Sequence, residues 1–186
     1  MWRESKTALP MPGAGIIFLY VDEITRQMQI RIIVVGRTKE HFLKEGIAEY
    51  TKRLSSYCRV EIKEVQEEKL QEPLSRNERD SAMQREAGRV SRAINKNSLV
   101  VALDPGGLPW TSEEFARQIT GWELSGRSDL AFIIGGASGL SEGLLDNADV
   151  RLSLSPMTFT HQMTRLILLE QIYRAFRISR GEPYHR

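Results

Sequence analysis

The chain ends on the sequence GEPYHR, which brings a phenol, an imidazole and a guanidinium together as Tyr184, His185 and Arg186. A histidine exchanges protons near neutral pH, and an arginine binds carboxylate or phosphate oxygens with its planar fork. Chain ends usually fray into solvent. The ending is therefore either a polar tail without a role or a set of groups delivered to a reactive site, and the rest of the chain must decide between them.

Three upstream segments could form the site that such a tail would serve. DPGGLPW follows Leu103, GGASGL follows Ile134 and SPMTFT follows Leu154, each after a run that predicts a buried strand. Glycine pairs let a ligand approach the backbone, and the third segment offers hydroxyls and an apolar lining. Ligands of parallel α/β sheets bind beyond the carboxyl ends of the strands. We therefore expect the three loops to face one pocket, for a ligand with polar and apolar parts.

Each of these features also has a plainer interpretation. A glycine pair after a strand is often only a tight turn, and GGASGL is not the GxGxxG dinucleotide motif. Asp104 can cap a turn, His41 falls in a polar stretch that faces solvent, and His161 can cap or pack against the start of the last helix. The sequence has no P-loop, no nucleophile elbow and no cysteine–histidine spacing suited to zinc, so we expect no metal.

Strands and helices alternate from residue 28 onward, which predicts a mainly parallel α/β sheet sandwiched by helices. Strands are expected at 30–36, 59–65, 99–104, 129–136 and 150–155, and helices at 39–54, 81–94, 111–124, 140–148 and 161–178. A capping box of Thr111 and Glu114 would open the helix at 111–124. The charged segment 66–80 is expected to be a mobile loop. The residues expected to face inward from 81–94 are Met83, Ala87, Val90 and Ile94.

The composition is that of an ordinary globular protein. Of its 186 residues 41% are hydrophobic, and the formal net charge is +2. The single cysteine, Cys58, cannot form an internal disulfide, so a reducing cytoplasm is the expected compartment. Residues 1–27 hold an apolar run too short to cross a membrane and no cleavage site. We interpret 1–27 as a leader or misassigned start outside the fold, and 28–186 as a single domain.

The helix at 161–178 is more apolar than packing on a sheet requires, because a stripe of roughly 100° suffices there. Its apolar residues are Met163, Leu166, Ile167, Leu168, Leu169, Ile172, Tyr173, Ala175, Phe176 and Ile178. A symmetric partner is the commonest cover for such a face, so we expect a homodimer. Glu170 and Arg174 are spaced as a helical ion pair. The arginines 165, 177, 180 and 186 add positive charge suited to phosphate.

The motifs ALDPGG, FIIGGASGL, LSLSPMTFTHQMTRLILLEQIYRA and GEPYHR, in this order, resemble those of the SPOUT-class methyltransferases of ribosomal RNA. Specifically, residues 28–186 resemble the bacterial family that methylates N3 of a pseudouridine in the large subunit. The resemblance implies a C-terminal trefoil knot, a homodimer and S-adenosylmethionine as methyl donor. The implied donor-binding residues are Leu103, Gly135, Gly136, Gly139, Leu154, Ser155, Pro156, Met157, Thr158 and Phe159.

The same resemblance implies a catalytic tail. Crossing the dimer interface would bring Tyr184, His185 and Arg186 next to the methyl group of the donor. Methylation of an imide nitrogen requires removal of its proton, so His185 is the candidate base or proton relay. Arg186 and Arg165 are candidate electrostatic and RNA contacts. The expected substrate is a stem-loop of 23S ribosomal RNA in assembled ribosomes.

Two alternatives belong to other classes of protein or substrate. A non-catalytic, ribosome-associated or nucleotide-binding α/β module would use the glycine loops to bind an adenine ligand, and it would not need His185. A related knotted enzyme could methylate transfer RNA, although the chain has no extra domain for that substrate. The tail separates the binding module from the enzyme, because only the enzyme requires a proton acceptor there.

Overall fold

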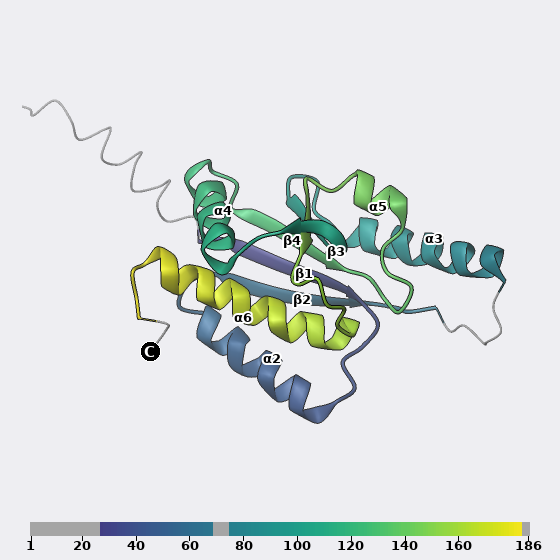
Figure 1. Ribbon diagram of the computed structural model, residues 1–186, viewed down its shortest axis with the longest axis horizontal. Coiled ribbons are helices and arrows are strands. Elements are labelled where there is room, and N and C mark those ends of the chain that lie inside the picture. Colours follow the sequence, from purple (N-terminus) through teal and green to yellow (C-terminus); the bar gives the residue numbers. More distant parts are fainter. Residues whose placement is uncertain (1–26, 69–74, 184–186) are drawn as a thin grey trace, which may run out of the picture.

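The computed structural model describes residues 27–68 and 75–183, and within them five parallel strands form one sheet in the order β2-β1-β4-β3-β5 (Figure 1). The strands are β1 (Gln29–Val35), β2 (Arg59–Val65), β3 (Leu99–Pro109), β4 (Asp129–Ile134) and β5 (Val150–Ser153). The predicted α/β class and parallel sheet are confirmed. The boundary predicted after residue 27 stays a prediction, because most of that segment lies outside the described residues.

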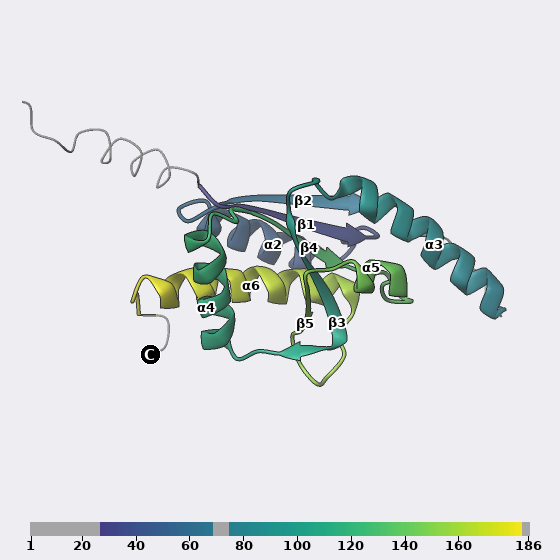
Figure 2. The same cartoon turned by 90° about the horizontal axis from the view of Figure 1, so that it is seen from above.

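Helices cover both faces of the sheet, as Figure 2 shows. The helices are α2 (His41–Leu54), α3 (Arg76–Ala93), α4 (Ser112–Leu124), α5 (Glu142–Asp146) and α6 (His161–Ser179). Side chains of β1 alternate between two cores: Ile32 packs with α2, α4 and α6, and Ile33 packs with α3 and α5. None of the helices in the described ranges is long and apolar enough to span a membrane.

Helix α6 lies between α2 and α4 on one face of the sheet and contacts both (Figure 1). Its residues Leu168, Leu169 and Ile172 have no exposed surface. Neighbours within the chain therefore account for much of the apolar breadth that predicted a partner, and the homodimer stays a prediction. The predicted ion pair of α6 is confirmed, with 2.5 Å between Arg174 and Glu170.

Helix α3 begins at Arg76, so the prediction of a loop up to residue 80 is wrong for its last five positions. The reason is a capping box: the Ser75 side chain accepts a hydrogen bond from the Glu78 amide, and the Glu78 carboxylate accepts one from the Ser75 amide. The capping box predicted at the start of α4 is confirmed. The inward face predicted for α3 is confirmed for Val90, which is buried, and for Ala87 and Ile94, which pack against the core; the other buried residues of the helix are Ala82, Glu86 and Ala93.

Strand β3 does not end at residue 104 as predicted but continues to Pro109 beside β5. Leu103 and Leu108 both pair with Leu152, so the residues between them form an irregular bulge in β3. Gly107 permits this close approach, because a Cβ there would lie 2.7 Å from the carbonyl carbon of Arg151. The loop expected after β3 is thus partly strand, and it turns the chain over the end of β5.

Candidate functional site

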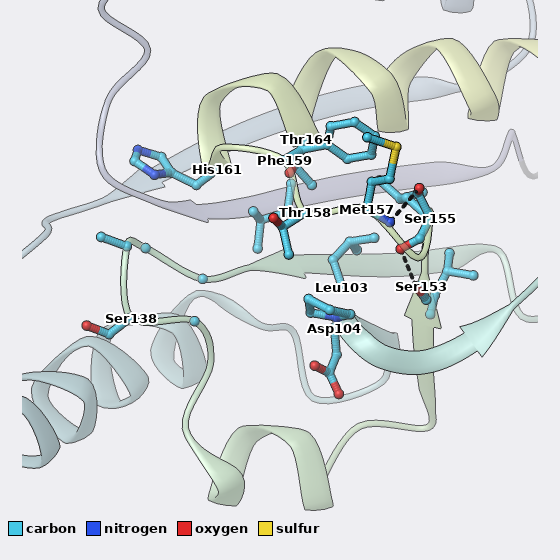
Figure 3. A pocket seen from close by; sticks show the side chains of 18 residues that line it. Leu103, Asp104, Ser138, Ser153, Ser155, Met157, Thr158, Phe159, His161 and Thr164 are labelled. Carbon is cyan, nitrogen blue, oxygen red and sulfur yellow. Dashed lines mark hydrogen bonds between the residues drawn. The ribbon is translucent and has the colours of Figure 1, made fainter.

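A pocket of about 370 Å³ opens at the bulge of β3 and beyond the ends of β4 and β5 (Figure 3). This volume falls within the range of small-molecule sites, roughly 300 to 1,000 Å³. The three loops meet here, as the strand pattern predicts. The predicted donor contacts that line the pocket are Leu103, Gly135, Gly136, Gly139, Leu154, Ser155, Met157, Thr158 and Phe159. Pro156 is not part of the lining, and the donor-binding role of all ten residues stays a prediction.

The wall contributed by the loop after β4 is largely backbone. Gly136 and Gly139 form a bridge, in which the Gly139 amide donates to the Gly136 carbonyl at 3.1 Å. Gly139 has a φ of +81°, which glycine adopts without strain. A Cβ on Gly135 would lie 2.3 Å from the carbonyl carbon of Gly139, so the loop closes only with glycine at 135. A ligand can therefore come close to peptide groups on this side.

The loop after β5 supplies hydroxyls and apolar groups. The Ser153 hydroxyl donates to the Ser155 carbonyl at 3.0 Å, and the Ser155 hydroxyl accepts from the Met157 amide at 2.9 Å (Figure 3). These two bonds fix the turn. Met157 and Phe159 remain 74% and 42% exposed, so two large apolar side chains are available to cover a ligand at the mouth.

The bulge of β3 contributes Leu103 and Asp104 to the lining. The carboxylate of Asp104 accepts a hydrogen bond from the Gly106 amide at 3.2 Å, which is the turn-capping interaction expected of it. Figure 3 shows Leu103 between Asp104 and Thr158 of the loop after β5. The pocket thus combines an apolar wall with polar groups that are fixed by their own turns, an arrangement suited to a ligand with an aromatic part and a polar part.

His161 is the pocket residue that the sequence interpretation missed. The helix-capping role belongs to Thr160, whose hydroxyl accepts from the Met163 amide, while His161 lies half-buried in the pocket lining. Burial lowers the pKa of His161, the charges of Arg165 and Lys39 lower it further, and Glu67 opposes them. The imidazole is therefore neutral at neutral pH. The available signal was its position directly after the SPMTFT loop. His41, in contrast, is exposed as predicted.

Arg165 is fully buried, and its expected role as an electrostatic and RNA contact stays a prediction. Its guanidinium donates to the Thr38 hydroxyl at 2.7 Å, the Glu64 carboxylate at 2.9 Å, and the carbonyls of Val35 and Gly36 at 3.1 and 2.8 Å. Burial lowers the pKa of Arg165 and Glu64 raises it, but arginine stays protonated. From this position the side chain holds the ends of β1 and β2 against α6.

The catalytic tail predicted from the sequence, Tyr184, His185 and Arg186, lies outside the described residues. The residues leading to it are held by α6. Arg177 donates to the carbonyl of Pro183 at 2.8 Å, and it forms an ion pair with Glu182. The tail therefore begins from a fixed point at the C-terminal end of α6.

Glu86 is a second buried group that the sequence interpretation missed. It is 8% exposed, one carboxylate oxygen accepts from the Glu68 amide at 2.8 Å, and the other lies 3.5 Å from where a Cβ of Gly136 would stand. Burial raises the pKa of Glu86, and the neighbouring charges of Glu67 and Glu68 raise it further. A carboxyl group thus stands behind the glycine loop of the pocket.

We expect Glu86→Gln to raise the stability of the fold at alkaline pH. Because the pKa of Glu86 is higher in the folded chain than in the unfolded one, its stabilising contribution is complete below the unfolded pKa and is lost as pH rises through the folded pKa. Glutamine does not ionise, so the variant does not lose this contribution as the pH rises. Urea unfolding at about pH 4 and about pH 8 measures the effect as a higher midpoint for the variant at the second pH.

Glu78→Gln on the same helix is the matched control with the opposite sign. Hydrogen bonds from Ser75 lower the pKa of Glu78, so its contribution is present above the unfolded pKa and is lost as pH falls through the folded pKa. This variant is expected to unfold at lower urea than the original chain at about pH 8. A lower midpoint for the Glu86 variant at that pH would contradict the account of its burial.

Comparison with known proteins gives consistent matches. A family model described as "Predicted SPOUT methyltransferase" matches residues 28–185. "Ribosomal RNA large subunit methyltransferase H" of Acetivibrio thermocellus is 52% identical over 159 residues, which are 86% of this chain and all of that protein. The protein of the same name from Clostridioides difficile is 52% identical over the same shares. A solved structure, a "Probable Methyltransferase from Bordetella pertussis Tohama I", is 13% identical with a TM-score of 0.48, covering 82% of this chain and 98% of that one.

Proposed function

The chain belongs to the SPOUT methyltransferase family, and from this premise we propose that it transfers the methyl group of S-adenosylmethionine to N3 of a pseudouridine in large-subunit ribosomal RNA. The observation that carries the proposal is the meeting of three loops at one pocket, at the bulge of β3 and beyond the ends of β4 and β5. Relatives named as large-subunit ribosomal RNA methyltransferases, 52% identical over their whole length, support ribosomal RNA as the substrate.

The pocket fits a donor of this kind in its chemistry. Leu103, Met157 and Phe159 offer apolar contact to an adenine ring, and the backbone of the glycine loop offers hydrogen bonds to polar parts. We propose all ten predicted residues, Pro156 included, as donor contacts. As the family resemblance implies, we further propose that these loops belong to a trefoil knot.

Side chains of the protein must take up the substrate proton and stabilise the charge that develops on the substrate. The sulfonium of the donor supplies an activated methyl group, so the reaction needs a proton acceptor and stabilisation of the anion but no Lewis acid. We propose that His185 serves as base or proton relay, and that Arg186 and Tyr184 stabilise the charge or hold the flanking phosphate. These roles rest on the family resemblance, because the tail lies outside the described residues.

The site is proposed to be completed in a homodimer, with the tail of one protomer reaching the pocket of the other. Large apolar side chains are exposed on α2 and at the pocket, and they support a protein partner on this side. They are Phe42, Met157 and Phe159. We propose the assembled ribosome as the substrate and the cytoplasm as the compartment. The small formal charge of +2 favours docking on a shaped surface over general attraction to RNA.

The test is methyl transfer from labelled S-adenosylmethionine to ribosomes that lack the modification, to purified 23S ribosomal RNA and to transfer RNA. We expect up to one methyl group per ribosome, at a rate at least about tenfold above that on naked RNA, because docking on a shaped RNA surface supplies the specificity. Mass spectrometry of the digested RNA then identifies the methylated atom. Binding of the donor without transfer to any substrate would favour the non-catalytic module, and transfer to transfer RNA alone would favour the related knotted enzyme.

A further inference from the structure

His161, a residue of the pocket lining outside the three loops, has the carboxylate of Glu67 in its neighbourhood. His161 is the first residue of α6, Glu67 follows β2, and Gly36, which directly follows β1, lies between them. A Cβ on Gly36 would lie 3.1 Å from a carboxylate oxygen of Glu67 and 3.5 Å from Nε2 of His161. Figure 3 shows His161 at the end of the pocket where Ser138 lies, away from Asp104.

The surroundings of His161 suit a proton acceptor. Within the described ranges its ring makes no hydrogen bond, and the cap of α6 is formed by Thr160, so the ring is free to bind a substrate proton. The charged groups that face it are Glu67 after β2, Lys39 before α2 and Arg165 on α6. Arg165 is itself paired with the Glu64 carboxylate. Burial keeps the imidazole neutral, and Glu67 is placed to stabilise the imidazolium once it forms.

We propose that His161 is the residue that takes up the proton released from the substrate nitrogen, with Glu67 stabilising the cation that results. The inference rests on the proposed function. The N–H bond of the imide breaks and its proton goes to Nε2 of His161, while the nitrogen lone pair forms the new N–CH₃ bond. The C–S bond breaks and its electron pair stays on sulfur. If His161 is the base, His185 keeps only the second of its two proposed roles, that of proton relay.

The test uses single-turnover methylation of ribosomes at saturating donor, measured from about pH 6 to about pH 9. His161→Gln is expected to lower the rate by about a hundredfold or more, within the range for removal of a general base, and to abolish the acidic limb of the profile. Calorimetric affinity for S-adenosylhomocysteine is expected to change less than about threefold, because the imidazole acts on the acceptor. The exposed His41→Gln is the matched control and should keep the original rate and profile.

The variant Glu67→Gln tests the proposal independently of His161→Gln. Removing the negative charge that raises the pKa of His161 lowers that pKa, so the acidic limb moves to lower pH while the plateau rate is kept within about tenfold. A structural role of either residue would not move the limb in this way.

The outcomes separate the two levels of the proposal. If the unaltered protein transfers no methyl group to any RNA, the proposed function fails. If it is active and His161→Gln keeps the rate and the acidic limb, the inference is overturned and the base belongs elsewhere. A loss of donor affinity with an unchanged profile also overturns it, because His161 would then bind the donor. If His185→Ala removes the acidic limb and His161→Gln retains it, the inference is overturned and His185 in the tail is the base.

Discussion

Gly135→Ala is expected to abolish measurable binding of S-adenosylhomocysteine and to remove methyl transfer with it. A Cβ at this position would lie 2.3 Å from the carbonyl carbon and 2.4 Å from the carbonyl oxygen of Gly139, and 2.8 Å from the amide nitrogen of Leu140. All three are backbone atoms, so no side chain can rotate out of the way. The loop has to open, and the backbone wall of the pocket moves with it.

Calorimetry with S-adenosylhomocysteine measures the effect of Gly135→Ala. We expect affinity to fall by at least about a hundredfold, which corresponds to about 2.8 kcal/mol. The melting temperature should fall as well, because the displaced loop joins β4 to α5. The variant Gly143→Ala in α5 is the matched control: no atom lies within 4 Å of its new Cβ, and alanine is the better helix former. Donor affinity of Gly135→Ala within about threefold of the original would show that this loop does not form the site.

The sheet and the position of the pocket were predictable because they depend on local patterns. Short β-branched runs, the glycine pairs after them and the Thr111 capping box each have a physical meaning that needs no distant partner. The early start of α3 was equally readable from Ser75 and Glu78. It was missed because the charged composition of 66–80 suggested a loop, although a capping box outweighs charge at a helix start.

The remaining features depend on contacts between residues far apart in the chain. Glu86 is buried because the amide of Glu68 binds it and the glycine loop covers it, and periodicity alone assigns a glutamate to solvent. His161 lies in the pocket beside Gly36 and Glu67, which precede it by more than ninety residues in the chain. The extension of β3 requires Gly107 to fit against the backbone of Arg151. In none of these cases does the local sequence around the partner residue indicate the contact.

Arg165 illustrates the same limit and gives the prediction with the largest expected effect on stability. Its partners lie 101 to 130 residues away along the chain, so the sequence offers an arginine on a helix and no sign of where it points. Arg165→Met keeps much of the volume but removes the arginine donor from two carbonyls and from the Glu64 carboxylate, which keeps its hydrogen bond from the Thr38 amide. Breaking a fully buried charge pair costs about 3 to 5 kcal/mol, but the Glu64 side chain is 37% exposed, so we expect urea unfolding to show a smaller loss, about 1 to 3 kcal/mol.

Arg53→Met is the control for charge and side-chain length, because Arg53 pairs with Glu49 across one exposed turn of α2. A pair exposed in this way contributes little to stability, because solvent screens the two charges. Combining Arg165→Met with Glu64→Gln should cost less than the sum of the two single changes, since each removes the same interaction. If Arg165 instead contacts RNA, Arg165→Met would keep its urea midpoint and lose ribosome methylation. A large loss of stability that Glu64→Gln partly relieves would establish that the arginine joins the ends of β1 and β2 to α6.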